Sequence, residues 1–208
     1  MKWLAILVCF VFPAAAFALT VEGKSYESSV TVQGHALKLI GAGLREVYGL
    51  NVYTLGAYSQ SGGCESKAVV DSEEVKYIRL DILRNIDAAK VVERINEAFG
   101  ASMPQNPSET LLKQRDQSFS YFKGRCLKGT VFEFIYLPGT GTIFRQNGKS
   151  MGPTIPGKEY HTVFWNVYFG PNTCCEELKG ELLVKCNPVP KAAPYTTADP
   201  LESQYGYH

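Results

Sequence analysis

Long apolar runs are scarce in this chain of 208 residues. The one at its start, residues 1–18, reads MKWLAILVCFVFPAAAFA, with one positive charge at Lys2 and the small-residue ending Ala16-Phe17-Ala18. A single early charge, a short apolar stretch and an A-x-A ending are typical of a secretory signal peptide, and the stretch is short for a bilayer span. We predict cleavage after Ala18, with an uncleaved anchor as the alternative. No later run is long enough to span a membrane.

Histidine is also rare, and no C-x-x-C pair is present. The three histidines are His35, His161 and His208, and none stands at ligand spacing. A zinc site needs clustered nitrogen and sulfur donors, and a serine or cysteine nucleophile needs a well-placed histidine base. We therefore predict no metal site and no catalytic histidine, and we interpret His35 and His161 as ordinary, partly exposed residues.

Glycine-rich cofactor loops are incomplete as well. The run GKS at 148–150 lacks the phosphate-loop glycine five residues before it, where Ile143 stands. The stretch GAGLR has two glycines of a dinucleotide fingerprint but not the third. We expect Gly41 and Gly43 to make a bend or a bulge instead, and we predict no cofactor.

Neither sign of charge is in excess. Without Lys2, the chain from residue 19 onward holds 20 basic and 20 acidic residues. A neutral chain gives no overall electrostatic reason to expect nucleic acid or an anionic membrane surface as a partner.

The length of the chain suits one domain, which we place at residues 19–186. The remaining segment, 187–208, has four prolines and few large apolar residues, and we expect it to be disordered.

The chain that follows the leader contains an odd number of cysteines. In an oxidising compartment, disulfides are expected, and an odd count leaves at least one thiol over or paired between chains. We expect Cys186 to pair with Cys174 or Cys175, and Cys64 with Cys126 is a weaker option. The five cysteines after the leader are Cys64, Cys126, Cys174, Cys175 and Cys186.

The first half of the domain has the period-two alternation of strands. Residues 28–43 alternate apolar and polar side chains around a turn at Gln33-Gly34. Residues 49–59, GLNVYTLGAYS, are rich in β-branched and aromatic side chains. Residues 75–83, VKYIRLDIL, alternate cleanly, so that Tyr77 and its alternate neighbours share one face and Ile78 and its neighbours share the other.

Helical segments and further strands follow. Asp87 has the position of an N-cap for a helix that ends at Gly100, and Asn106 that of a cap for a helix to about Phe122. Strands, then helices, then strands, then helices predict an α+β fold with a largely antiparallel sheet covered by helices. The other expected elements are a short helix in 64–74, strands in 129–146 with an Asn-Gly hairpin at 147–148, and helices in 158–169 and 174–185.

Arg45 has an unusual setting for a permanent charge. We expect it in the short hinge between two apolar strands, with Tyr48, Tyr53 and Tyr58 following. One interpretation is a hinge arginine that faces water or pairs with Glu46 or another acid. The other is that a guanidinium between apolar strands needs an anionic partner, which nearby tyrosine hydroxyls could help to hold.

The order of motifs resembles the chalcone isomerase superfamily. The stretch VTVQGHALKLIGAGLREVYGLNVYTLGAYS, residues 30–59, is similar to that family's G-x-G-hydrophobic-Arg strand and its G-x-Tyr strand. Residues 78–99 look like its strand followed by a helix, residues 137–170 like its Pro-Gly-x-Gly-Thr strand, turn and helix, and LKGELL like its final helix. The resemblance covers roughly 19–184, and the short hinge and leader look most like the secreted bacterial branch.

The resemblance implies an open-faced β-sandwich with a layer of helices and a ligand cleft between them. It places Arg45 at the cleft and Tyr53 where the fatty-acid-binding relatives carry a tyrosine and the true isomerases a threonine. The catalytic tyrosine of the isomerases corresponds to the region of Asp87, which we interpret as a helix cap. Lesser ligand-binding candidates are Tyr58, Tyr48, Arg84 and Asn147.

Three functions remain open from the sequence. The first is a periplasmic or secreted protein that binds a fatty acid or another small apolar carboxylate without catalysis, through Arg45 and Tyr53. The second is an isomerase or intramolecular lyase that orients an enone or phenolic substrate and stabilises an enolate. The third is a structural or interaction protein with a vestigial cleft.

Overall fold

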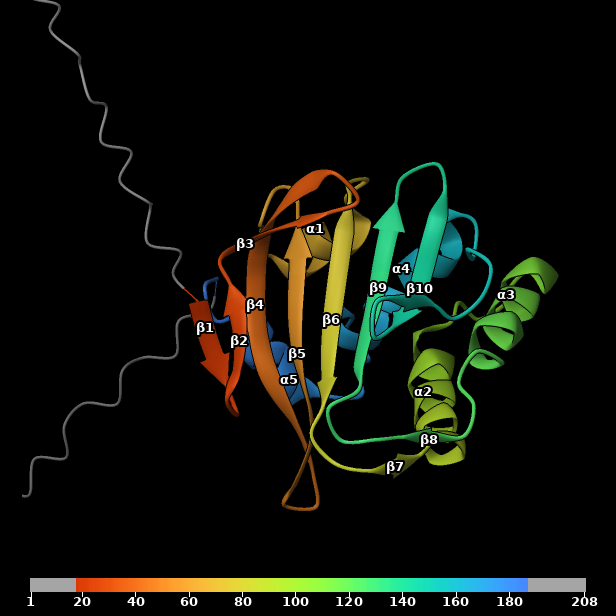
Figure 1. Ribbon diagram of the computed structural model, residues 1–208. Coiled ribbons are helices and arrows are strands. Elements are labelled where there is room, and N and C mark those ends of the chain that lie inside the picture. Colours follow the sequence, from red (N-terminus) through yellow and green to blue (C-terminus); the bar gives the residue numbers. More distant parts are fainter. Residues whose placement is uncertain (1–17, 187–208) are drawn as a thin grey trace, which may run out of the picture.

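The computed structural model describes residues 18–186 (Figure 1), so the predicted leader and the predicted disordered segment lie outside the described residues. The strands are β1 (Ala18–Val21), β2 (Lys24–Glu27), β3 (Ser29–Val32), β4 (His35–Val47), β5 (Leu50–Ser59), β6 (Lys76–Ile82), β7 (Ile86–Asp87), β8 (Arg125–Cys126), β9 (Val131–Leu137), β10 (Gly141–Gln146) and β11 (Lys149–Ser150). The helices are α1 (Ser66–Asp71), α2 (Ala88–Ser102), α3 (Glu109–Phe119), α4 (Lys158–Phe169) and α5 (Glu176–Leu182).

A seven-stranded antiparallel sheet forms the body of the fold. Its strand order is β11-β10-β9-β6-β5-β4-β3, and the pairs β1-β2 and β7-β8 form two small sheets. Helices α1, α4 and α5 cover one face of the large sheet, and α2 and α3 lie toward its β9–β10 side (Figure 1). This arrangement confirms the predicted α+β fold, an open-faced β-sandwich with a helical layer.

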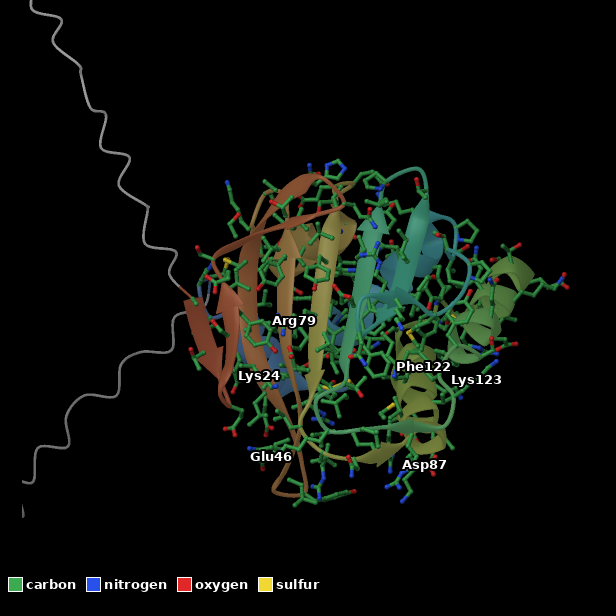
Figure 2. The ribbon with its side chains drawn as sticks, viewed as in Figure 1. Lys24, Glu46, Arg79, Asp87, Phe122 and Lys123 are labelled. Carbon is green, nitrogen blue, oxygen red and sulfur yellow. A yellow bond between two sulfur atoms is a disulfide. The ribbon has the colours of Figure 1, made fainter. Side chains whose placement is uncertain are left out.

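The two faces of the sheet differ because side chains alternate along each strand. In β6, Ile78, Leu80 and Ile82 belong to the core beneath the helices, whereas Tyr77 belongs to a second, smaller core on the opposite face. Arg79 also points to that opposite face, as Figure 2 shows. The alternation predicted for residues 75–83 is therefore confirmed.

Tight turns with positive φ join the main hairpins. The pairs Gln33–Gly34, Tyr48–Gly49 and Asn147–Gly148 all have positive φ at both residues. That combination is the type I′ geometry, whose twist matches the strands it connects. The turn at Tyr48–Gly49 corrects the expected hinge, because β4 continues to Val47 and Arg45 is therefore a strand residue.

Gly41 and Gly43 of the GAGLR stretch lie at a β-bulge and at a close contact with α5. The register between β4 and β5 shifts between Leu39 and Gly41, which confirms the expected bulge. A Cβ at Gly41 would lie 2.1 Å from the carbonyl oxygen of Leu182 in α5. A Cβ at Gly43 would lie 2.5 Å from the Glu181 carboxylate. Glycine thus lets α5 pack directly on the backbone of β4.

Helix boundaries follow local capping, with corrections. Asp87 caps α2 as predicted, since its Oδ1 accepts a hydrogen bond from the amide of Ala89 at 2.8 Å. The cap of α3 is Ser108 rather than Asn106, because Ser108 Oγ accepts from the Leu111 amide at 3.0 Å. Helix α2 continues past the predicted stop at Gly100 to Ser102, and α3 ends at Phe119 rather than near Phe122.

The disulfide pairing differs from both expectations. Cys64 pairs with Cys186, Cys174 pairs with its neighbour Cys175, and Cys126 is a free, buried thiol. The first bridge ties the segment before α1 to the segment after α5, which no short-range spacing could indicate. One thiol is left over, as the odd count of cysteines predicted.

His161 is also buried rather than partly exposed. It lies in α4, fully buried, with its ring stacked on Tyr136 at 3.5 Å between centroids. Its Nε2 lies 3.3 Å from the ammonium group of Lys76, which is likewise fully buried. Lys76 also donates to the carbonyl of Val70 at 2.9 Å, so β6, α1 and α4 meet at this amine.

Candidate functional site

Arg45 and Tyr53 are direct neighbours across β4 and β5. The antiparallel register places Arg45 opposite Tyr53, and Tyr53 opposite Ile82 of β6. Directly opposed residues point to the same face of a sheet. Tyr53 packs against the core beneath the helices, and so does Leu55 two residues on. The register therefore directs the half-buried Arg45 side chain to the helix-covered face.

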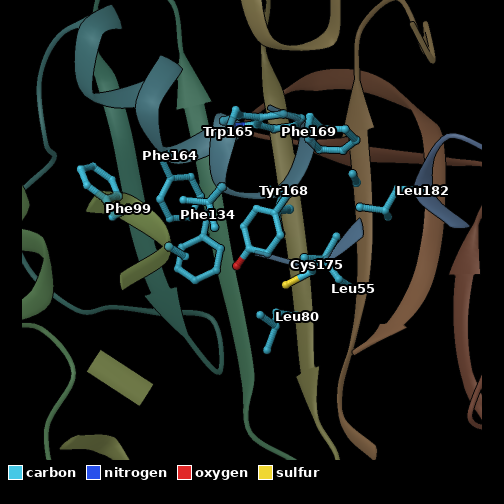
Figure 3. Close-up of a cluster of buried hydrophobic side chains, with 14 of the residues drawn as sticks. Leu55, Leu80, Phe99, Phe134, Phe164, Trp165, Tyr168, Phe169, Cys175 and Leu182 are labelled. Carbon is cyan, nitrogen blue, oxygen red and sulfur yellow. The ribbon is translucent and has the colours of Figure 1, made fainter. Parts of the chain in front are cut away.

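Tyr168 of α4 completes this cluster from the helical side. It is 6 % exposed and belongs to the same core. Figure 3 shows its ring beside Phe134 and Cys175, with the hydroxyl directed away from Trp165 and Phe169. The Tyr168 and Tyr53 hydroxyls lie near enough to affect each other's pKa, and the charge of Arg45 acts on both rings.

The two tyrosines stay protonated at neutral pH. Burial raises the pKa of Tyr53 to about 12, although the Arg45 charge and the nearby Tyr168 hydroxyl act in the opposite direction. Burial also raises the pKa of Tyr168 well above its ordinary value. Both hydroxyls are therefore neutral donors beside a fixed positive charge, a combination that suits recognition of an anion and makes poor general bases.

The guanidinium of Arg45 has no acidic partner among residues 18–186. No Asp or Glu of this part of the chain places a carboxylate oxygen within 4.0 Å of it. Glu181 of α5, which packs against Gly43, instead accepts a hydrogen bond from the Leu44 amide at 2.7 Å. A half-buried cation without a protein anion is costly unless a ligand or water satisfies it.

The lesser candidates do not all join this cluster. Tyr48 is 94 % exposed in the β4–β5 turn. Tyr58 is buried on the opposite face of the sheet, in the second core with Tyr26 and Tyr77. Arg84 is half-buried just after β6 and forms no ion pair with any described residue.

Asn147 also lies apart from Arg45. It is a turn residue whose Oδ1 accepts from the Val131 amide at 2.8 Å. Four strand spacings separate β10 from β4, or about 19 Å. Asn147 lines a separate surface hollow of about 400 Å³ together with Lys149 and Ser150. The structure thus brings together Arg45 and Tyr53, and not Tyr58 or Asn147.

Tyr168 is the site residue that the sequence analysis missed. The helical spacing of residues 158–169 marks it simply as one more apolar position. A tyrosine on the buried stripe of a helix does carry one signal, because its hydroxyl needs a partner in the core. The identity of that partner depends on how α4 crosses β5, which is a tertiary property.

Apolar side chains surround the cluster. Aromatic rings fill the space between α4 and the sheet, with Phe134 and Phe164 centroids 5.0 Å apart. Toward α2, Ile86 and Val91 are half-buried at the margin of the core. Neither of the two surface hollows described here is lined by Arg45, Tyr53 or Tyr168.

Metal-binding clusters and membrane-spanning helices are absent from residues 18–186. No three His, Cys, Asp or Glu side chains in this part of the chain are grouped so as to hold a metal ion. None of its helices is both long enough and apolar enough to cross a membrane.

A surface hollow of about 570 Å³ between the end of α2 and α4 is lined by Met103, Lys158 and Val163 among others, and lies apart from the Arg45 cluster along α4.

Comparisons with known proteins agree with this architecture. A crystal structure of a fatty-acid binding protein from Arabidopsis thaliana has the same fold, with a TM-score of 0.66 and 14 % sequence identity over 81 % of this chain and 97 % of that one. No curated protein matches the sequence. The model of the family described as chalcone isomerase-like matches residues 18–184. With its G-x-G-hydrophobic-Arg strand, its antiparallel sheet and its covering helices, the chain belongs to the chalcone isomerase-like family.

Proposed function

We propose that this protein binds a small apolar carboxylate of the fatty-acid class and does not transform it. The observation that carries the proposal is that half-buried Arg45, the strand residue directly opposite Tyr53, has no carboxylate partner in residues 18–186. The carboxylate of the ligand would take the place of the missing protein acid. The fold shared with a fatty-acid binding protein supports the same conclusion.

Charge-assisted hydrogen bonds would hold the ligand's head group. Arg45 offers a planar, bidentate donor set that matches a carboxylate. The neutral hydroxyls of Tyr53 and Tyr168 add donors to the same point, because their raised pKa values keep them protonated. The hydrocarbon tail would follow the half-buried apolar margin formed by Ile86 and Val91.

Two features favour binding over isomerase chemistry. The position that the family resemblance relates to a catalytic tyrosine is occupied by Asp87, whose carboxylate is committed to capping α2. The two tyrosines that are near Arg45 have raised pKa values, so neither serves as a base at neutral pH. The cluster can stabilise an anion, but it lacks a group placed to move a proton.

We propose further that the protein is exported to the periplasm or the medium. The predicted leader at 1–18 supports export. The two disulfide bridges among the described cysteines support an oxidising compartment, since reducing compartments rarely keep structural disulfides.

The decisive experiment compares a fatty acid with its neutral ester on wild type and two variants. We expect delipidated wild type to bind dodecanoic acid and to bind methyl dodecanoate much more weakly, as measured by calorimetry. Arg45→Ala should weaken binding of the acid by roughly ten- to a hundredfold, because a charge-assisted hydrogen bond contributes about 1.5–3 kcal/mol. Native mass spectrometry of protein from the exporting host should show a bound acid in wild type and not in this variant.

Arg145→Ala is the matched control. Arg145 is a half-buried strand arginine of β10, on the sheet face away from the helices. This variant should bind the acid like wild type. Equal affinity of Arg45→Ala and wild type for the acid, or equal affinity of wild type for acid and ester, would refute the proposed function.

A further inference from the structure

Large exposed apolar side chains gather at one end of the molecule. Five such residues are strongly exposed among those described, and three of them lie at the end where the β4–β5 hairpin turns. Their exposed fractions are 94 % for Tyr48, 50 % for Leu50 and 53 % for Leu127. The other two, Leu19 and Val184, lie on β1 and after α5. Exposed apolar side chains that cluster at one point mark a contact surface more reliably than scattered ones.

Backbone hydrogen bonds join the segments that carry these three residues. The Leu83 amide donates to the Val52 carbonyl at 3.0 Å, which ties the β5 strand to the end of β6. The Gly129 amide donates to the Ile82 carbonyl at 2.8 Å and brings the loop after β8 to the same place. Figure 1 shows the β4–β5 turn, β7, β8 and the start of α2 together along this lower edge.

The same edge carries a small excess of positive charge. Arg84 precedes β7, and Arg125 lies in β8. Lys90 lies in the first turn of α2, and Lys128 follows β8. None of these four basic residues forms an ion pair with any described acid.

Two of the acids on this edge are already engaged. Asp87 caps α2, and Glu97 pairs with Arg94 at 2.8 Å. Glu46 and Glu93 remain without an ion pair in residues 18–186. Counting Arg45 and Arg94, six basic residues of this edge stand against these four acids, a local excess of two positive charges in a chain that is neutral after its leader.

Exposed apolar side chains with basic residues nearby are complementary to an anionic lipid surface. Aromatic and aliphatic side chains enter the boundary between head groups and acyl chains, while Lys and Arg reach the phosphates. Each basic residue near such a surface contributes about 1 kcal/mol, and the attraction falls off within a Debye length.

We propose that this edge docks reversibly on an anionic phospholipid bilayer, with Tyr48, Leu50 and Leu127 in the interface and the four unpaired basic residues above them. Arg45 lies in β4 three residues before Tyr48, so docking brings the mouth of the Arg45 cluster to the lipid surface. A carboxylate ligand could then pass between bilayer and protein without crossing water. The docking itself goes beyond the proposed function and does not require it.

Vesicle flotation tests the proposal. The purified protein should co-float with vesicles of phosphatidylcholine containing about one third phosphatidylglycerol, and much less with pure phosphatidylcholine. The variant Tyr48→Asn/Leu50→Thr/Leu127→Ser should partition at least about tenfold less. Asparagine suits position 48, where φ is +51°, and threonine suits a strand, so the variant should fold. Raising the salt concentration should release wild type.

Two matched variants show whether flotation depends on this edge in particular. Leu19→Thr/Val184→Ser removes exposed apolar side chains elsewhere and should float like wild type. Tyr53→Phe, which removes a proposed carboxylate donor without changing the charge, should also float like wild type while binding the carboxylate more weakly, so the two proposals can fail independently. The docking proposal is overturned if the triple variant floats like wild type, or if wild type does not float or prefers neutral vesicles. It is overturned too if the triple variant only converts a dimer to a monomer, as light scattering would show, because the edge would then be a contact between copies.

Discussion

The Lys76 ammonium group is a buried charge without a buried carboxylate. It contacts the Val70 carbonyl and His161 Nε2, and the Trp165 ring lies 5.3 Å away. Burial lowers the pKa of Lys76 to about 8, although Glu74 and Glu73 act in the opposite direction. Burial, with the Lys76 charge, holds the pKa of His161 far below its ordinary value, so its ring is neutral and accepts at Nε2.

This depressed pKa predicts that stability rises with pH in mild alkali. Between the folded pKa of about 8 and the unfolded value of about 10.4, the unfolded chain keeps the Lys76 proton and the folded chain has lost it. The contribution of Lys76 to stability therefore increases with pH in that window, by up to about 1.4 kcal/mol per pH unit. Urea unfolding from pH 7 to about pH 8.5 should show the rise in wild type and not in Lys76→Met.

The exposed Lys149 provides the control. Lys149→Met should keep the wild-type pH profile, because the Lys149 side chain lies on the surface and not in the core. An identical slope in Lys76→Met and wild type would assign the rise to another group. Above about pH 9 the sign reverses, since the buried tyrosines and the Cys126 thiol keep protons that the unfolded chain releases.

At the scale of elements, the contact of α5 with β4 sets one wall of the site. Helix α5 approaches so closely that Gly41 and Gly43 leave no room for a methyl group. The Leu44 amide, next along β4, donates to Glu181 of α5. Arg45 follows directly, so its position depends on how α5 seats on the strand.

Gly41→Ala should therefore destabilise the protein by about 1–3 kcal/mol. Its Cβ would meet the backbone carbonyl of Leu182, which cannot rotate away as a side chain could. Gly100→Ala is the counterpart, because Gly100 lies within α2 with nothing near its missing Cβ. That change should stabilise by about 0.5–1 kcal/mol. Denaturant midpoints measure both, and a neutral Gly41→Ala would show that α5 is not seated as described.

At the scale of the whole molecule, local signals were predictable and long-range pairings were not. The face alternation of 75–83, the Asp87 cap and the Asn-Gly hairpin depend on near neighbours and are confirmed. Ser108 displaced Asn106 because two nearby residues could both cap, and packing decided between them. The contact of Lys76 with His161 and the approach of Tyr168 to Tyr53 join distant segments, which no spacing rule encodes.

The bridge between Cys64 and Cys186 should dominate stability in the oxidised protein. The two cysteines are 122 residues apart in the sequence, and long closed loops gain most from a crosslink. Cys64→Ser should cost about 2–5 kcal/mol of unfolding free energy. Cys126→Ala, which removes the free buried thiol, should cost about 1 kcal/mol. Equal losses in the two variants, or no added sensitivity of wild type to reductant, would argue against this bridge.

That bridge also fixes an order of events in biogenesis. Cys186 follows every described strand and helix in the sequence. The Cys64–Cys186 bond consequently cannot form until the complete domain has emerged, so it forms last, across a domain that has already folded. Cys126 emerges earlier and would offer Cys64 a wrong partner in the meantime. Burial raises the pKa of the Cys126 thiol and so lowers the fraction of reactive thiolate. Once the core has formed, Cys126 therefore no longer competes with Cys186 for Cys64. A chain that folds before it oxidises would thus avoid the mispaired crosslink, whereas one that oxidises first would be trapped by it.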